Sequence, residues 1–185
     1  KIEKLLNNFN GIVVIDEAYI DFSNEESWVS KLVDFDNLIV TQTLSKAYGM
    51  AGIRLGICIA SEEIIGILNK IKPPYNVNEL TQKKALERVL DIKKVNQEVA
   101  DILVERELLS QALLQLNFIR KVYESDANFI LAKVDNATSR YNQLLQKGIV
   151  VRNRTTQPLC ENTLRFTVGT TEENRKLISA LKEIQ

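Results

Sequence analysis

Short apolar runs mark the first third of the chain, and each is bounded by polar or glycine-containing segments. They occupy residues 13–15, 38–40 and 54–60. The first run, of Ile and Val, is typical of a strand buried on both faces of a sheet, the second predicts a short buried strand, and the third predicts a further strand. Between and after them, the polar pattern predicts helices over residues 23–32 and over residues 61–71, the second ending before Pro73-Pro74.

A different pattern fills residues 79–117, which contain no Pro or Gly. Apolar residues recur there at alternating three- and four-residue spacing, at Ile92, Val95, Val99, Ile102, Leu109, Leu113 and Leu116. This period predicts a long helix with one apolar stripe. Because Arg106 interrupts the stripe, a helix that packs within and between domains is favoured over a sustained coiled coil.

The last part of the chain alternates strands and helices again. Strands are predicted at residues 118–123, 128–134, 149–151 and 164–168. Gly148 is predicted to end one helix in a left-handed conformation, and Thr170 with Glu173 forms a capping box that opens the final helix to Gln185. This pattern predicts a small α+β domain over residues 118–185.

The composition excludes several classes of function, chiefly because of its balanced charge and its lack of histidine. Lys and Arg number 24, Asp and Glu number 24, and there is no histidine. A balanced charge gives no electrostatic argument for nucleic acid or an anionic membrane. Without histidine, a Ser-His-Asp or Cys-His nucleophile is excluded, and no cysteine or acid cluster suggests a metal site. Proton transfer therefore falls to a lysine, a tyrosine or a carboxylate.

The cysteines and the lengths of the apolar runs indicate in which cellular compartment the protein is located. No run approaches the ~20 residues that span a bilayer, and the first residues do not resemble a signal peptide. Cys58 and Cys160 are expected to be buried free thiols, since intracellular proteins rarely keep disulfides. A cytoplasmic protein without membrane contact is predicted.

The segment from Thr41 to Arg54 carries the clearest candidate chemistry, because it combines hydroxyls, one lysine, two glycines and one arginine. An amine in a dry pocket, such as that of Lys46, can lose its proton and attack an aldehyde. Thr43, Ser45 and Arg54 suit a phosphate, to which they can donate charge-assisted hydrogen bonds. An aldehyde and a phosphate on one small molecule describe pyridoxal phosphate.

A second segment upstream supports this interpretation. Asp16 ends the first apolar run, at the carboxyl edge where open α/β sheets bind ligands. A carboxylate there can pair with a protonated pyridine nitrogen and keep the ring electron-withdrawing. Tyr19 can donate to the phenolic oxygen of the same ring. The alternative for Asp16 is that it only caps the following turn.

These motifs resemble those of the fold-type I pyridoxal-phosphate aminotransferases, and within them the histidinol-phosphate aminotransferase family. The resemblance covers nearly the whole chain, through Asp16-x-Ala-Tyr19, Thr43-Leu-Ser45-Lys46-Ala-Tyr-Gly-Met-Ala-Gly-x-Arg54, Ser125-Asp-Ala-Asn128, Gly148-Ile-Val-Val-Arg152-Asn and Leu164-Arg165-Phe-Thr-Val-Gly-Thr170. It implies an α/β fold forming the C-terminal part of such an enzyme. Residues 1–78 would form the C-terminal half of the large mixed-sheet domain, and residues 118–185 would form the small domain. Residues 79–117 would be a long helical segment that links the two domains. The members carry an amino-terminal half that this chain lacks, so a fragment is expected.

The resemblance also implies roles. Lys46 is expected to form the Schiff base and move protons, with Asp16 and Tyr19 on the cofactor ring and Thr43, Ser45 and Arg54 on its phosphate. Arg152 and Arg165 are expected to hold the anionic groups of the substrates. Arg154, Tyr75 and Asn128 receive no role.

The expected reaction is amino transfer between L-glutamate and imidazole-acetol phosphate in histidine biosynthesis, by a homodimer that acts on histidinol phosphate and 2-oxoglutarate in the reverse direction. Three alternatives remain open: another fold-type I enzyme, such as an aromatic aminotransferase or a threonine-phosphate decarboxylase; a non-catalytic aminotransferase-like module; or an inactive fragment.

Overall fold

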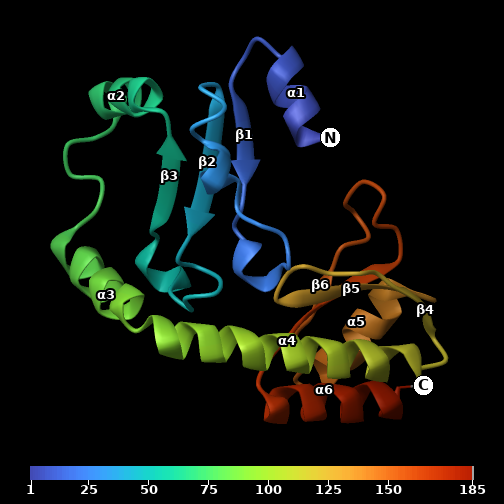
Figure 1. The fold of residues 1–185 in the computed structure, drawn as a ribbon. Coiled ribbons are helices and arrows are strands. Elements are labelled where there is room, and N and C mark those ends of the chain that lie inside the picture. Colours follow the sequence, from blue (N-terminus) through green and yellow to red (C-terminus); the bar gives the residue numbers. More distant parts are fainter. Residues whose placement is uncertain (185) are drawn as a thin grey trace. The chain divides into compact units, whose positions relative to one another are not determined.

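The computed structural model describes residues 1–184, and the chain folds into two compact units, Lys1–Asn96 and Gln97–Gln185 (Figure 1). The boundary lies within α4 (Ile92–Leu114). No helix of the described residues is both long and apolar enough to cross a membrane.

The first unit is built around a three-stranded sheet in the order β1-β2-β3, formed by β1 (Val13–Asp16), β2 (Leu38–Thr43) and β3 (Gly56–Ala60). β1 and β2 are parallel, and β3 is antiparallel to β2 (Figure 1). The carboxyl ends of β1 and β2 and the beginning of β3 therefore share one edge of the sheet. Three short 3-10 helices, η1 (Ile20–Phe22), η2 (Trp28–Lys31) and η3 (Ala51–Ile53), lie in the connections.

Only one face of this sheet is covered within the described chain. Val13 is 9% exposed and packs in a cluster with Leu6, Leu38 and Val40, whereas Val14 is 57% exposed. The expectation of a strand buried on both faces is therefore wrong for β1. The reason is that α1 (Ile2–Asn8) and the η2 segment cover the same side.

The region predicted to be one long helix, residues 79–117, contains two helices instead. α2 (Glu62–Ile71) ends before the proline pair as predicted, but residues 79–114 form two helices, α3 (Glu79–Leu90) and α4, which are separated at Asp91 (Figure 1). The Asp91 carbonyl accepts from the backbone N–H of Lys94 and of Val95. Asp91 thus ends one helix and begins the next while the apolar stripe continues.

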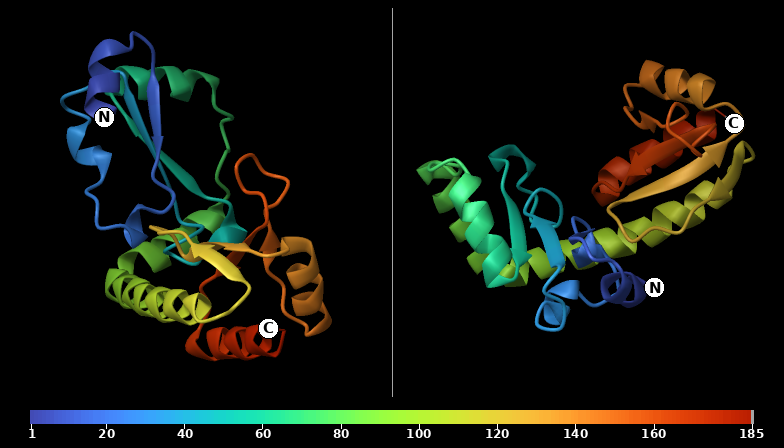
Figure 2. Two further views of the ribbon diagram at one scale, coloured as in Figure 1. Left: turned by 90° about the vertical axis from the view of Figure 1, so that its right-hand side faces the viewer. Right: turned by 90° about the horizontal axis from the view of Figure 1, so that it is seen from above.

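The second unit is an antiparallel sheet packed against helices (Figure 2). Its strand order is β4-β5-β7-β6, with β4 (Ile119–Val122), β5 (Phe129–Val134), β6 (Arg152–Asn153) and β7 (Thr163–Thr167). α5 (Ala137–Gln146) and α6 (Thr171–Glu183) complete it. One apolar cluster joins the strands to α4, α5 and α6, and its fully buried members include Leu109, Phe118, Ile130, Leu144, Phe166 and Leu181.

Two helix boundaries of this unit follow the sequence prediction, the glycine after α5 and the start of α6, whereas α6 ends at Glu183 and the predicted end at Gln185 lies outside the described residues. Gly148 has a φ of 73°, in the left-handed region that glycine enters without strain. The Thr170 side chain accepts from the N–H of Glu173, whose carboxylate accepts from the N–H of Thr170, so the capping box is complete.

Candidate functional site

The predicted cofactor residues gather at the edge where β1 and β2 end. Asp16 is the last residue of β1 and lies opposite Thr41 of β2. Its Oδ1 accepts from the N–H of Ala18 at 3.1 Å and from the Thr41 hydroxyl at 3.4 Å. The side chain is exposed, and its Oδ2 accepts no hydrogen bond from residues 1–184. Asp16 therefore caps the turn and still has one carboxylate oxygen available for a ligand.

The loop that carries Lys46 is held by its own backbone and by two buried side chains. Leu44 and Ala47 are each 3% exposed, and they anchor the loop on either side of Lys46. The N–H of Met50 donates to the Leu44 carbonyl, and the N–H of Gly49 donates to the Lys46 carbonyl, both at 2.9 Å. Gly49 has a φ of 68°, which this tight turn requires and which a side chain would strain.

The Lys46 side chain turns toward Tyr19. Its Nζ lies 5.3 Å from the centre of the Tyr19 ring, a distance at which an ammonium is attracted to the face of an aromatic ring. Lys46 is half-buried and forms no ion pair with the described residues. The structure thus brings together two residues that lie 27 positions apart in sequence, and leaves the amine without a carboxylate partner.

Thr43 occupies the base of this loop. Its hydroxyl donates to the Leu55 carbonyl at 3.2 Å and accepts from the N–H of Ser45 at 3.1 Å. A hydroxyl has one proton to donate, so Thr43 cannot also donate to a phosphate while it keeps its bond to Leu55. The Ser45 hydroxyl is half-buried and has no hydrogen-bond partner among the described residues. Of the two hydroxyls, that of Ser45 is the one available for a phosphate.

Arg54 ends η3 in the left-handed conformation, with a φ of 53°. Such a conformation costs about 1 kcal/mol in a residue with a side chain. The side chain is exposed; one guanidinium nitrogen donates to the Ala51 carbonyl at 2.9 Å, and within residues 1–184 no carboxylate pairs with it. The lysine loop therefore presents two cations without anionic partners, together with one available hydroxyl.

The two remaining predicted residues belong to the second unit, where they are cross-strand neighbours. Arg152 on β6 lies directly opposite Arg165 on β7. Like charges opposite one another in a sheet repel unless an anion lies between them. Neither arginine forms an ion pair with the described residues.

The surroundings of Arg165 strengthen the case for an anion. Its guanidinium lies 4.8 Å from the centre of the Phe129 ring, within the range of a cation–π attraction. Its Nε is buried and has no hydrogen-bond partner in the described structure. A buried donor without a partner costs about 1–3 kcal/mol, so an incoming carboxylate or phosphate would relieve this cost.

Sequence reasoning missed Glu17. This residue is 6% exposed, and its carboxylate accepts from Ser27, Trp28 and Gln42. The signal was present: a second acid follows Asp16 directly, and alternation along a strand sends consecutive side chains to opposite faces.

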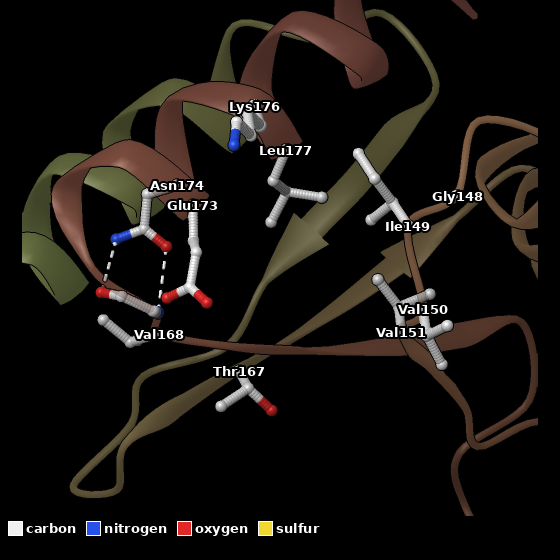
Figure 3. A pocket seen from close by; sticks show the side chains of 11 residues that line it. Gly148, Ile149, Val150, Val151, Thr167, Val168, Glu173, Asn174, Lys176 and Leu177 are labelled. Atoms are coloured by element: carbon white, nitrogen blue, oxygen red, sulfur yellow. Dashed lines mark hydrogen bonds between the residues drawn. The ribbon is translucent and has the colours of Figure 1, made fainter.

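Two hollows of the second unit contain none of the predicted residues. One, of about 520 Å³, is shown in Figure 3 and is lined by the end of β7, the segment before β6 and the first turns of α6. Its Glu173 and Asn174 already bond to Thr170 and Gly169, and most of its other lining is apolar. The other, of about 650 Å³, is lined by Glu98, Asp101 and Glu105 and would repel an anion. Among residues 1–184, no group of His, Cys, Asp or Glu is arranged to hold a metal.

Comparison with known proteins agrees with this geometry. Residues 1–181 match the family model for aminotransferases of class I and II. Two relatives are histidinol-phosphate aminotransferases. That of Flavobacterium johnsoniae is 66% identical over 98% of this chain and 52% of its own length, and that of Christiangramia forsetii is 62% identical over 100% and 53%. The chain spans about half the length of the curated relatives it matches.

A solved structure gives the same result for the fold. The crystal structure of the histidinol-phosphate aminotransferase from Clostridium acetobutylicum superposes with a TM-score of 0.91 at 27% identity, covering 99% of this chain and 57% of that one. The predicted fold class, part of a fold-type I transferase, is confirmed. The chain belongs to the class I and II aminotransferase family.

The cysteines differ from expectation. Cys160 is half-buried, but Cys58 on β3 is exposed. The prediction that both are buried is wrong for Cys58, because it lies on a strand with little cover in the described chain.

Proposed function

We propose that this chain is part of a histidinol-phosphate aminotransferase that uses pyridoxal phosphate. The proposal rests on the cross-strand pair Arg152 and Arg165, two cations without an ion-pair partner that suit a substrate with strongly anionic groups. The names of the relatives at 66% and 62% identity support this substrate over that of a decarboxylase or an aromatic aminotransferase.

The donor set at the edge of the first sheet fits pyridoxal phosphate. Asp16 Oδ2 is available for the ring nitrogen, Lys46 for the aldehyde, and Ser45 and Arg54 for the phosphate, and Tyr19, which lies beside Lys46, would donate to the phenolic oxygen. Thr43 would support the phosphate site chiefly by holding the turn. When bound, the group supplies an electron sink that stabilises negative charge on the substrate α-carbon.

The chain's own residues would then divide the remaining work. Lys46 Nζ takes the proton from the α-carbon and returns it, as the general base and then the general acid. Asp16 holds a proton at the ring nitrogen by its negative charge. Arg165 binds the carboxylate of glutamate and an anionic group of histidinol phosphate, and Arg152 helps to hold the phosphate of that second substrate, both through charge-assisted hydrogen bonds.

The test is a transamination assay on the purified protein expressed from its complete gene. Histidinol phosphate with 2-oxoglutarate should give glutamate, and histidinol without the phosphate should react at least about tenfold more slowly, because it lacks a charge-assisted contact. Glutamate formation that is equally fast with histidinol, or release of carbon dioxide from phosphothreonine without glutamate, would contradict the proposal.

We also propose a cytoplasmic homodimer. The resemblance to the family supports the dimer, and the exposed thiol of Cys58 fits a reducing compartment. Light scattering during size-exclusion chromatography measures the mass directly, and a monomer at micromolar concentration would contradict the dimer.

A further inference from the structure

Glu17 is a buried acid with both of its carboxylate oxygens in use. Oε2 accepts from the Ser27 hydroxyl at 2.7 Å and from Gln42 Nε2 at 3.0 Å, and Oε1 accepts from the N–H of Trp28 at 2.6 Å. Burying a carboxylate is costly unless hydrogen bonds replace its hydration. An apolar side chain of the same volume would avoid that cost, so the distinct contribution of Glu17 is to fix geometry.

The backbone of Glu17 is fixed as firmly as its side chain. Its N–H donates to the Thr41 carbonyl at 2.8 Å, which extends the pairing of β1 with β2 by one residue. Its carbonyl accepts from the N–H of Ile20 at 3.1 Å, where η1 begins. The short segment from Asp16 to Tyr19 is therefore held from both sides of Glu17.

The partners of the Glu17 carboxylate come from two separate parts of the first unit. Gln42 lies on β2 one residue before Thr43, at the root of the lysine loop, and Ser27 and Trp28 begin η2. The carboxylate joins the strand end that carries Asp16 and Tyr19 to the strand end that carries Lys46.

We propose that Glu17 is a positioning residue for the cofactor site, one that sets Asp16 and Tyr19 in place relative to Lys46 without touching the ligand. This inference rests on the proposed function, because it concerns the same cofactor site. Glu17 acts on that site through the backbone at Asp16 and through Gln42.

The test compares Glu17→Gln with Glu26→Gln in the protein expressed from its complete gene. Glu26 is an exposed acid near Ser27, so its substitution removes the same charge from the same segment and serves as the matched control. An amide has a single acceptor oxygen and turns its NH₂ group toward a donor, so Glu17→Gln keeps the volume and breaks the geometry.

Two readouts separate positioning from general stability. Affinity for pyridoxal phosphate is measured by absorbance titration, and the orientation of the bound ring by circular dichroism in its visible band. Glu17→Gln should weaken affinity about tenfold and change the visible dichroism at saturation, whereas Glu26→Gln should match the unmodified protein. A Glu17→Gln protein with unchanged affinity and dichroism would overturn the inference.

A further variant covers the case in which Glu17→Gln does not fold. Gln42→Leu keeps the carboxylate and two of its donors while removing the side-chain link to β2, and it should change affinity and dichroism in the same direction by a smaller factor. Unchanged values in a folded Gln42→Leu protein overturn the inference. Failure of the unmodified protein to bind pyridoxal phosphate would instead overturn the proposed function.

Discussion

The residues around Lys46 determine where its side-chain amine lies. Buried Leu44 and Ala47 hold the loop on either side of it, Gly49 permits the turn, and the Tyr19 ring lies 5.3 Å from its Nζ. The loop therefore holds the amine beside Tyr19, where no carboxylate of the described residues pairs with it.

Replacement of Lys46 tests this directly. After incubation with pyridoxal phosphate and reduction with borohydride, the protein should carry one stoichiometric adduct on Lys46, located by peptide mass spectrometry. Lys46→Ala should abolish that adduct, because the reacting amine is gone. Lys70→Ala, which removes an exposed lysine from α2, should leave it intact. Adducts scattered over several lysines would contradict the assignment.

The hydrogen bonds of the Thr43 hydroxyl lead to a second prediction about a single residue. Thr43→Val keeps the shape of the side chain but removes the bonds to Leu55 and Ser45, so the loop should lose about 1–2 kcal/mol of stabilisation. We expect weaker binding of pyridoxal phosphate by about tenfold, measured by absorbance titration. Thr43→Ser retains the hydroxyl and should restore most of the affinity; equal affinities for the two variants would show that the bonds do not matter.

At the scale of elements, tertiary hydrogen bonds replace helical ones in several places. Residues 23–32 were predicted to be a helix, yet only η2 (Trp28–Lys31) forms there, because the Trp28 N–H donates to Glu17 and Ser27 caps the short turn. The predicted strand at 149–151 begins only at Arg152, because the Ile149 N–H donates back to the Leu144 carbonyl of α5.

The start of α5 provides a prediction about pH. Arg140 binds the Asp135 carboxylate through two hydrogen bonds, at 3.0 and 2.7 Å, and this lowers the pKa of Asp135 below its ordinary value of 3.8. The charged form is therefore favoured on folding, so its stabilisation is present above pH 3.8 and is lost as the pH falls through the lower folded value.

Asp135→Asn should accordingly reduce the free energy of unfolding by about 1 kcal/mol at pH 7, and the difference from the unmodified protein should shrink at pH values below 3.8. Urea unfolding followed by far-ultraviolet circular dichroism measures both values. Asp126→Asn, an exposed acid in the same unit, is the control. A difference that stays constant with pH would exclude the ion pair as its cause.

At the scale of the whole molecule, the predicted residues divide between the two units. Asp16, Tyr19, Lys46 and Arg54 all belong to Lys1–Asn96, and the arginine pair belongs to Gln97–Gln185. In the proposed function, the first unit therefore holds the cofactor and the second recognises the substrate. Substitutions in the two units should have separable effects.

Arg165→Gln tests this division. It should raise the KM for histidinol phosphate about tenfold to a hundredfold, because it removes a charge-assisted contact to an anion. Affinity for pyridoxal phosphate should stay within about twofold of the unmodified protein. Arg120→Gln, on the exposed part of β4, should change neither value. An equal loss of cofactor and substrate affinity in Arg165→Gln would argue against the division.

The sequence by itself determined the fold class and the candidate residues, because strand periodicity, the Gly148 cap, the Thr170 capping box and the motif around Lys46 are all local patterns. The fold class is confirmed; the roles of Lys46, Asp16 and the other site residues stay predictions. The division into residues 1–78, 79–117 and 118–185 also stays a prediction beside the two observed units.

Only the tertiary structure decided which polar groups already form hydrogen bonds within the chain. Thr43 and Ser45 both offer a hydroxyl in the sequence, but that of Thr43 bonds to Leu55, twelve residues away. Arg152 and Arg165 became neighbours only through the pairing of β6 with β7, and Glu17 became a link between strands only through Ser27, Trp28 and Gln42. These contacts join residues that are distant in sequence, and local patterns do not encode such partners.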